Sequence, residues 1–355
     1  MAWYLTNITL ILLSQLPLTG RKIKFNEKRT VCIVGAIDWI LLSGLRHLSV
    51  GADTYAYKYL FNGVVSQSWA KVIEQLKLRL TLANTTKDPG YTLIVKLFQC
   101  FSDNYRIWLI VIACAFIIPM AIWIYKNSSD PCVSFIVFST LFYSFFAITG
   151  LRQTIATAIA FFGGMEFIRK ERPLGFLLTV LLASLIHASS IVLLPLYFLN
   201  KIKISKATLS AYWFLIIFVF LFRDKVFNVL KAFAGYDYYM KSATASGGTF
   251  IFLLLAMAAV YTIFYRQIGA SKNPQLNIAS NSLFMACVFS PLLLVNESCM
   301  RIVQYYSIFI IILLPEYKYI FKKESRIIFN VIVCAVMILL LIRNQPVYHF
   351  FWERI

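Results

Sequence analysis

Long apolar runs without charges are the feature that most constrains how this chain can fold. Residues 107–121, 250–260 and 327–342 contain no charged side chain, and such runs are typical of membrane-spanning helices. Only 14% of the 355 residues are charged and 60% are hydrophobic, whereas about a quarter of a soluble domain is charged. This composition excludes a soluble enzyme, a disordered chain and a disulfide scaffold. The unbroken runs exclude an outer-membrane barrel, whose strands alternate apolar and polar residues.

The runs predict an all-α, polytopic integral membrane protein. A helix satisfies its own backbone hydrogen bonds, which lipid cannot do, so the open-chain segments that cross a bilayer are helical. The sequence indicates about twelve membrane segments, some of them short or re-entrant. We expect a single integral membrane domain over residues 1–355.

The net charge of +19 would suggest nucleic-acid binding in a soluble protein. Here most cations lie in short connectors between apolar runs, and cytoplasmic loops carry an excess of Lys and Arg. We therefore expect no nucleic-acid partner and place five basic connectors in the cytoplasm: 21–29, 169–172, 201–206, 266–272 and 318–326. Counting crossings from these connectors predicts external loops at about 46–105 and 223–249, and an external tail at 344–355.

Two apolar stretches are too short to cross a bilayer, which needs about twenty residues. The piece at 91–101 lies inside the first external loop, and it predicts a re-entrant or interfacial helix. The stretch 174–200 has basic connectors at both ends, so it must cross twice or not at all. It predicts a hairpin whose apex, near residues 187–190, stops below the outer surface.

Arg152 is the polar residue that most needs an explanation. It stands between the mainly apolar residues 145–151 and 155–162, with no room for a solvated loop. Its long side chain either reaches lipid headgroups or faces an anionic ligand in a cavity. Arg301 lies in an equally short external turn and favours the second interpretation, because guanidinium groups bind phosphate through two parallel hydrogen bonds. Two or three such groups would suit a pyrophosphate.

His187 and Asp53 are candidate acid or base groups, each with a simpler alternative. His187 is either a packing histidine or a functional one, since an ionisable group inside a membrane is costly. Asp53 follows Gly51 and forms either a turn or helix cap or part of a site. The chain contains no Walker A motif, no HExxH motif and no acidic cluster suited to a divalent metal. We therefore predict no cofactor and no metal site.

Four short motifs follow one another in the first half of the chain. They are Arg46-x4-Gly51-x-Asp53-x3-Tyr57, Asp88-Pro89-Gly90-Tyr91, Gly150-Leu151-Arg152-Gln153-x-Ile155-Ala156 and Ala183-x3-His187-x-Ser189. In order and spacing they resemble the EpsG-like branch of bacterial polysaccharide polymerases, which are Wzy-type O-antigen, capsule or exopolysaccharide polymerases. The resemblance covers about residues 46 to 200, with Arg301 and Pro346-x-Tyr348 fitting more loosely. It departs from the family at Asp88, where the family usually has Glu.

The resemblance implies a GT-C-like architecture and a lipid-linked substrate. That substrate is an oligosaccharide repeat unit on undecaprenyl pyrophosphate, handled at the outer face of the bacterial inner membrane. The implied activity is that of a metal-independent glycosyltransferase, in which the growing glycan leaves its carrier and joins the next lipid-linked unit. Implied partners are this substrate, membrane lipid and a chain-length-determining co-polymerase.

Such a reaction needs a base for the acceptor hydroxyl and cations for the departing pyrophosphate. We assign Asp53 as the base and His187 as the group that orients the acceptor, with the reverse assignment as the alternative. Arg152, Arg301 and Arg46 are assigned to the pyrophosphate. The glycan-binding candidates are Tyr55, Tyr57, Asp88, Tyr91, Gln153, Glu297 and Tyr348.

Two other activities would use similar residues. A lipid-linked oligosaccharide flippase or other transporter would also line a cavity with cations, but it is expected to place them near the bilayer midplane with access from both sides. In this sequence they fall on the predicted outer side. An O-antigen ligase would move finished glycan to a different lipid, and the acceptor in a reconstituted reaction distinguishes it from a polymerase.

Overall fold

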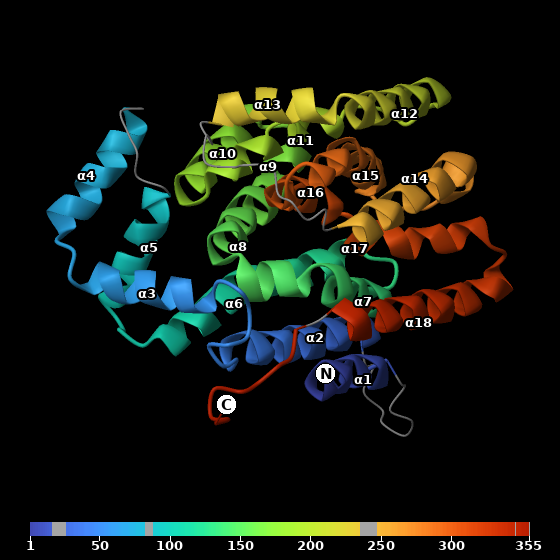
Figure 1. Cartoon of the computed structure of the whole chain (residues 1–355). Helices are drawn as coiled ribbons and strands as arrows, with labels where there is room; N and C mark the ends of the chain where they lie inside the picture. Colours follow the sequence, from blue (N-terminus) through green and yellow to red (C-terminus); the bar gives the residue numbers. More distant parts are fainter. Residues whose placement is uncertain (16–25, 82–87, 235–246, 345, 355) are drawn as a thin grey trace. The chain divides into compact units, whose positions relative to one another are not determined.

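The computed structural model describes residues 1–15, 26–81, 88–234, 247–344 and 346–354. This described part is helical throughout (Figure 1), and its one β-bridge pairs Arg46 with Phe350. The prediction of an all-α protein is confirmed. Residues 21–25 of the first basic connector, 82–87 of the first predicted external loop and 235–246 of the second lie outside the described residues.

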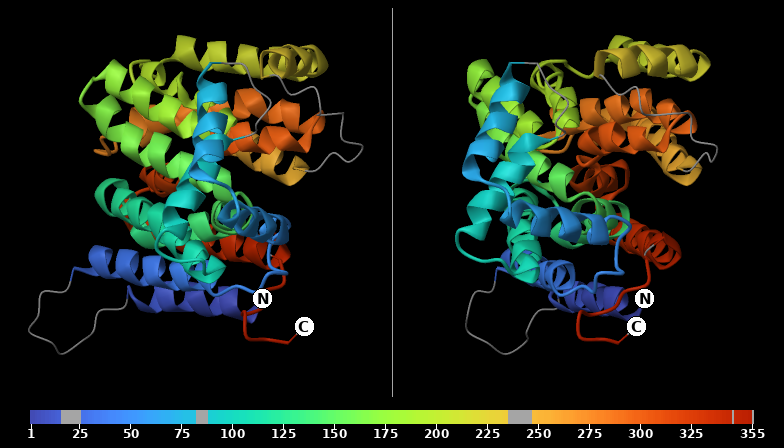
Figure 2. Two further views of the ribbon diagram at one scale, coloured as in Figure 1. Left: turned by 90° about the vertical axis from the view of Figure 1, so that its left-hand side faces the viewer. Right: turned by 60° about the vertical axis from the view of Figure 1, so that its left-hand side comes forward.

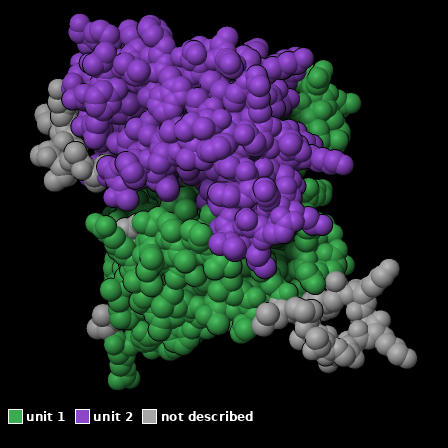
Figure 3. Space-filling view, turned by 90° about the vertical axis from the view of Figure 1, so that its right-hand side faces the viewer, with its two compact units in different colours: residues 1–191, 330–355 green, residues 192–329 purple. Residues whose placement is uncertain are grey.

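The chain divides into two compact units, coloured separately in Figure 3. Unit 1 comprises Met1–Ile191 and Asn330–Ile355, and unit 2 comprises Val192–Phe329. The single membrane domain expected from the sequence stays a prediction. Unit 1 contains α1 (Ala2–Leu13), α2 (Glu27–Gly44), α3 (Thr54–Val65), α4 (Trp69–Leu80), α5 (Pro89–Gln99), α6 (Tyr105–Asn127), α7 (Pro131–Leu141), η1 (Ser144–Thr149), α8 (Leu151–Thr157), η2 (Ala158–Gly163), α9 (Gly164–Arg169), α10 (Pro173–Ile186) and most of α18 (Arg326–Asn344).

Unit 2 contains shorter and more broken helices. They are α11 (Leu196–Leu199), α12 (Lys206–Leu221), α13 (Arg223–Ala234), α14 (Gly248–Ile268), α15 (Leu276–Phe289), η4 (Ser290–Leu294), η5 (Glu297–Cys299), α16 (Met300–Ser307), α17 (Ile310–Leu313), η6 (Leu314–Ile320) and η7 (Lys323–Ser325), with η3 (Ala188–Leu193) at the boundary between the units. Asn281 in α15 links this helix to α12 and to the segment 199–202. Its amide nitrogen donates to the carbonyl oxygens of Leu199 and Ile202 at 3.1 and 2.8 Å, and its amide oxygen accepts from the Tyr212 hydroxyl at 2.9 Å.

Four described segments are long and apolar enough to cross a membrane: Tyr105–Asn127, Gly248–Ile268, Leu276–Leu294 and Lys323–Arg343. Glu297–Ser307 and Ile310–Ile320 together make a fifth if this pair, bent by 44°, is one span. These helices make the chain a membrane protein. The shorter apolar helices include Ala2–Leu13, Pro131–Leu141, Pro173–Ile186 and Lys206–Leu221. The count of about twelve membrane segments and the GT-C-like architecture stay predictions.

Local sequence signals set several helix starts. Asn26, Asn104 and Asp130 each accept a hydrogen bond from a backbone N–H in the first turn of α2, α6 and α7, which satisfies a donor that the helix itself leaves unpaired. Pro89 and Pro131 stand at the first position of α5 and α7, where the missing N–H of proline costs nothing.

The ends of the unit 1 helices alternate between two sides. At one side, the start of α2 meets the end of α6, where Asn26 donates to the Tyr125 hydroxyl at 3.2 Å. The start of α18 reaches the same side, since Asn330 donates to Asp130 at 2.6 Å. At the other side the end of α2 pairs with the C-terminal segment, because His47 N–H donates to the His349 carbonyl at 2.8 Å. The predicted external tail and first external loop therefore lie on the same side of unit 1.

That first loop folds into three helices, α3, α4 and α5, which Figures 1 and 2 show grouped at one end of α2 and α6. Two side chains of α5 tie it to α3. Lys96 donates to the carbonyl oxygens of Val64 and Val65 at 3.3 and 3.0 Å, and Gln99 donates to that of Phe61 at 2.7 Å. A helix in the predicted stretch 91–101 is confirmed as α5, whereas its re-entrant or interfacial placement stays a prediction. The contacts with α3 hold the Asp88 end of α5 in position.

Candidate functional site

Asp88 is the centre of a buried polar cluster in unit 1. It precedes α5 with a left-handed backbone (φ 55°), and only 5% of the residue is exposed. Its Oδ2 atom accepts from Nη1 of Arg152 at 2.9 Å and lies 3.4 Å from Nδ1 of His187. Its Oδ1 atom accepts from the backbone N–H of Ala188 at 3.3 Å. One carboxylate thus joins residues from three motifs that are far apart in the sequence.

His187 enters this cluster because α10 ends there. Its backbone is extended (φ −151°, ψ 108°), and the residue is 5% exposed. The start of α5 lies against the end of α10, and this requires Gly90: a Cβ at that position would lie 2.7 Å from the carbonyl atoms of Leu185. The glycine of the Asp-Pro-Gly-Tyr motif therefore permits the approach that places Asp88 beside His187.

Arg152 lies in the first turn of α8, between two π-helices, Ser144–Thr149 and Ala158–Gly163. Single π-turns inside helices are frequent at functional sites. The guanidinium carbon is 5.8 Å from the centre of the Tyr57 ring and 5.3 Å from that of Tyr91. The side chain is 17% exposed, and its buried Nε has no hydrogen-bond partner among the described residues. Arg152 is thus held by one carboxylate and two rings, with donors left for a ligand.

The charges of the cluster reinforce one another. Burial raises the pKa of Asp88, but the hydrogen bonds and positive charges of His187 and Arg152 outweigh this effect and lower the pKa to about 2. Opposite charges and hydrogen bonds to the ionised form favour that form. Asp88 is therefore a carboxylate at neutral pH and a weak base, suited to holding cations in place.

Arg46 lies in a closed backbone environment, and its assignment to the pyrophosphate stays a prediction. The residue is 2% exposed. Its Nη1 donates to the carbonyl oxygens of Ser43 and, at 3.2 Å, Ala147, and its Nη2 donates to that of Ile148 at 3.1 Å. The guanidinium thus binds the backbone of the π-helix Ser144–Thr149, which ends two residues before the first residue of α8. This contact positions the turn that carries Arg152.

The other residues proposed from the sequence fall into four groups. Tyr57 and Tyr91 border Arg152, with their ring centres 5.8 Å apart. Asp53 and Tyr55 are exposed at the start of α3, and Asp53 stands one helical turn before Tyr57. Gln153 is buried in α8, and Tyr348 is buried with its hydroxyl donating to the Leu42 carbonyl at 2.9 Å. Glu297 is exposed and Arg301 is partly buried in unit 2.

The structure adds two residues to this site, Trp108 and Gly90, and gives Asp88 different contacts from those expected. Asp88 was assigned from the sequence to glycan binding, but its contacts place it between a cation and an imidazole. Trp108 was not singled out; its indole N–H donates to the Tyr91 hydroxyl at 3.4 Å and so holds the ring that faces Arg152. Gly90 was read as part of a motif without a role. Its place after Asp-Pro, at the start of a helix, is the signal that could have indicated a close backbone contact.

Within the described ranges, no three His, Cys, Asp or Glu side chains come together in a way that could hold a metal ion. The cluster around Asp88 contains one carboxylate, one imidazole and one guanidinium, and a guanidinium in this position would repel a cation. Its chemistry suits an anion better than a metal.

Comparison with known proteins gives one result. The model of the EpsG family matches residues 29–353, which include Asp88, Arg152 and His187. The comparison with curated proteins and that with solved structures each find no match. The family match supports a polymerase-like role in polysaccharide biosynthesis. It extends over nearly the whole chain, well beyond the four motifs, and the chain belongs to the EpsG family.

Proposed function

We propose that this protein is a polysaccharide polymerase that joins undecaprenyl-pyrophosphate-linked oligosaccharide repeat units at the outer face of the bacterial inner membrane. The observation that carries the proposal is the Asp88 carboxylate, which contacts both Arg152 and His187. This arrangement places an anion-binding group and an acid–base group next to each other. A glycosyl transfer that releases a pyrophosphate needs both.

Arg152 is proposed to bind the leaving pyrophosphate. Its Nη1 is occupied by Asp88 at 2.9 Å, which fixes the plane of the guanidinium, and its buried Nε lacks a partner within the described part of the chain. Donors fixed before the reaction stabilise developing negative charge without reorganisation. Arg301 is proposed as a second pyrophosphate ligand on the resemblance alone.

His187 is proposed to act as the general base, with Asp88 as its partner. A carboxylate 3.4 Å from Nδ1 favours the tautomer with hydrogen on Nδ1 and a lone pair on Nε2. The acceptor hydroxyl gives its proton to Nε2 while its oxygen attacks the anomeric carbon of the donor. The bond from that carbon to the pyrophosphate oxygen breaks, and the electron pair leaves with the lipid carrier. The proposed roles require no metal.

Asp53 keeps a different role in this proposal. It is exposed and its side chain does not cap α3, so no neighbour within the described ranges holds it for proton transfer. Residues four apart on a helix share a face, which places Asp53 on the Tyr57 side of α3. We propose that Asp53 and Tyr57 contact the acceptor sugar. A solvent-exposed carboxylate is a weaker candidate for the base than a histidine oriented by a partner.

The test is an assay of the purified full-length protein with a lipid-linked repeat unit as both donor and acceptor. His187→Ala should lower turnover at saturating acceptor by about 10²–10⁴, and Asp53→Asn should mainly raise the acceptor concentration needed. His349→Ala and Asp103→Asn, which change a histidine and an exposed aspartate elsewhere, are the matched controls and should leave turnover unchanged. Near-normal turnover in His187→Ala with loss in Asp53→Asn would reverse the two roles.

The same assay distinguishes the alternative activities. A polymerase produces a ladder of products that differ by one repeat unit, all on the lipid carrier. A ligase transfers glycan to a different lipid, and a flippase moves the substrate across the bilayer without forming a glycosidic bond. If no lipid-linked unit gives a ladder, and the units are instead transported across the bilayer intact, the polymerase proposal is contradicted. A chain-length-determining co-polymerase is the partner we propose to test by adding it to this reaction.

A further inference from the structure

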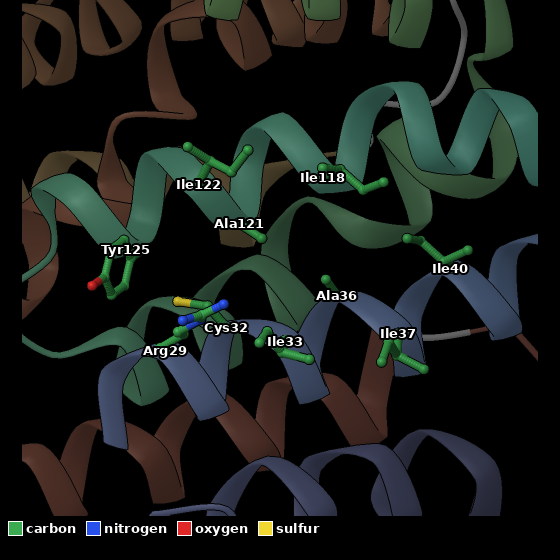
Figure 4. A pocket seen from close by; sticks show the side chains of 10 residues that line it. All are labelled: Arg29, Cys32, Ile33, Ala36, Ile37, Ile40, Ile118, Ala121, Ile122 and Tyr125. Atoms are coloured by element: carbon green, nitrogen blue, oxygen red, sulfur yellow. The ribbon is translucent and has the colours of Figure 1, made fainter. Parts of the chain in front are cut away.

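A groove lies on the surface of unit 1 between α2 and α6, on the two helices that pack most closely in this unit (Figure 4). Its volume is about 550 Å³. The lining residues come from one stretch of each helix: Arg29, Cys32, Ile33, Ala36, Ile37 and Ile40 of α2, and Ile118, Ala121, Ile122 and Tyr125 of α6. Nothing in the site around Asp88 uses this groove.

The groove has a narrow floor and apolar walls. Cys32, Ala36 and Ala121 are small and buried, and they form the floor. The walls are branched side chains about half exposed: Ile33 at 47%, Ile37 at 52%, Ile118 at 45% and Ile122 at 49%. From Arg29 to Ile40 a helix rises about 16 Å. Half of a hydrocarbon core about 30 Å thick has nearly the same length, so one extended acyl chain would fit along the groove.

One end of the groove is polar and basic. Arg29 and Tyr125 lie together at that end in Figure 4, opposite Ile40 and Ile118. Asn26 donates to the Tyr125 hydroxyl at 3.2 Å, so the ring is held in place. Arg29 is exposed, as are Lys28, which precedes it in the sequence, and Lys126, which follows Tyr125. A guanidinium at the mouth of an apolar groove is complementary to a phosphate attached to an alkyl chain.

We propose that this groove binds one acyl chain of an anionic phospholipid, whose phosphate contacts Arg29. The argument for this occupant is charge complementarity at one end and chain-sized apolar walls along the rest. The basic end is the start of α2, whereas Arg46 and the cluster around Asp88 lie beyond the end of α2. A single phosphate group of the lipid-linked substrate therefore does not contact both Arg29 and the cluster around Asp88. The inference concerns a separate lipid site and does not depend on the proposed function.

The test measures lipid retention by the purified full-length protein with native mass spectrometry. The probes are phosphatidylglycerol, phosphatidylcholine and a polyprenyl phosphate, each added at the same concentration. We expect the wild-type protein to retain phosphatidylglycerol preferentially. Arg29→Gln should weaken this retention about fivefold, the usual effect of one cation near an anionic headgroup. Lys71→Gln, which changes an exposed lysine on α4 away from the groove, is the matched control and should retain the lipid as the wild type does.

A second variant tests the groove itself. Ala121→Phe fills the floor and should reduce retention of phosphatidylglycerol more than Arg29→Gln does. Val331→Phe, at a position on α18 that is 63% exposed, is the control for an added aromatic ring on the apolar surface. Equal retention of the two phospholipids by the wild type, or unchanged retention in both Arg29→Gln and Ala121→Phe, would overturn the proposal. Displacement of phosphatidylglycerol by an equal amount of polyprenyl phosphate would assign the groove to a carrier lipid and would also overturn it.

Discussion

Arg46 and Arg152 look alike in the sequence, yet unit 1 surrounds them differently. Both are single cations next to apolar runs, and both were expected to bind pyrophosphate. Arg46 is 2% exposed and donates to three backbone carbonyl groups, while its buried Nε, like that of Arg152, has no hydrogen-bond partner among the described residues. Arg152 pairs with a carboxylate, lies beside two tyrosine rings, and its side chain is 17% exposed. We therefore expect Arg46 to hold the backbone and Arg152 to serve a ligand, because Arg152, unlike Arg46, pairs with a carboxylate and lies beside two rings.

The largest effect should follow from removing Arg152. Arg152→Ala should lower the rate of polymer formation by about 10²–10³, the usual cost of losing one donor to a developing oxyanion. Arg152→Lys should recover little, since an ammonium cannot reproduce a planar contact with two donors. The measurement is the rate of ladder formation by purified protein, together with its melting temperature to show that it is folded.

Arg106→Ala is the matched control for this prediction. The guanidinium carbon of Arg106 lies 3.2 Å from the centre of the Phe351 ring, and the residue is not part of the cluster around Asp88. It should change the rate little. Full activity of Arg152→Ala would remove Arg152 from the site and would make the two arginines equivalent structural residues.

Removing Arg46 should mainly destabilise the fold. In Arg46→Leu three carbonyl oxygens lose their donor, and each unsatisfied buried polar group costs about 1–3 kcal/mol. We therefore expect the free energy of unfolding in detergent to fall by about 3 kcal/mol or more, while the protein that remains folded binds substrate. If Arg46→Leu instead kept wild-type stability and lost substrate binding, Arg46 would be a ligand after all.

The sequence predicts one of these two environments better than the other. The motif around Arg152 and the apolar residues on both sides indicate a cation held for a purpose, and the structure brings it to Asp88 and His187. Two of the three carbonyl partners of Arg46 come from residues about a hundred positions away. Such pairing depends on how α2 packs against the turn before α8, and no local pattern specifies it.

The same limit applies to the helices. Length and apolar character predict the segments that form α6, α14 and α18, because each of them satisfies its own backbone. They do not predict that residues 54–80 form α3 and α4, which are short and partly polar. The break at His187 was expected from the length of 174–200, but its contact with Asp88 depends on the approach that Gly90 allows.

The next prediction concerns the acid stability of the Asp88 cluster, which has no counterpart at Arg46. The pKa of Asp88 is about 2 in the folded protein, below the ordinary value near 4. The ionised carboxylate therefore stabilises the fold above about pH 4, and this contribution is lost as the pH falls through about 2. Near neutral pH, Asp88→Asn should be less stable than the wild type by about 2 kcal/mol.

Chemical unfolding of both proteins at several pH values measures this difference. It should shrink as the pH falls below 4, since the wild type then loses the charge that the variant lacks. A difference that already disappears between pH 5 and 7 would mean that Asp88 titrates there and has an ordinary or raised pKa. Arg46→Leu provides the contrast, because its loss of stability involves carbonyl groups and should not change over the same pH range.

The smallest and most selective effect should come from two glycines. Gly90 lies next to Asp88, the partner of Arg152, and Gly51 lies against Ile148, whose carbonyl Arg46 binds. A Cβ at Gly90 would meet the Leu185 carbonyl at 2.7 Å, and one at Gly51 would meet the Ile148 side chain at 2.4 Å. Gly90→Ala should move Asp88 away from His187 by less than 1 Å; since a 1 Å misplacement costs about 10²-fold, we expect about a tenfold loss of rate. Gly51 has φ +95°, so Gly51→Ala strains its own turn and presses on Ile148, whose carbonyl Arg46 binds. It should reduce stability with little change in rate per folded molecule. Measuring rate and stability for both variants tests the comparison directly, because a shared loss of rate without loss of stability would place the turn at Gly51 in the same site as Asp88.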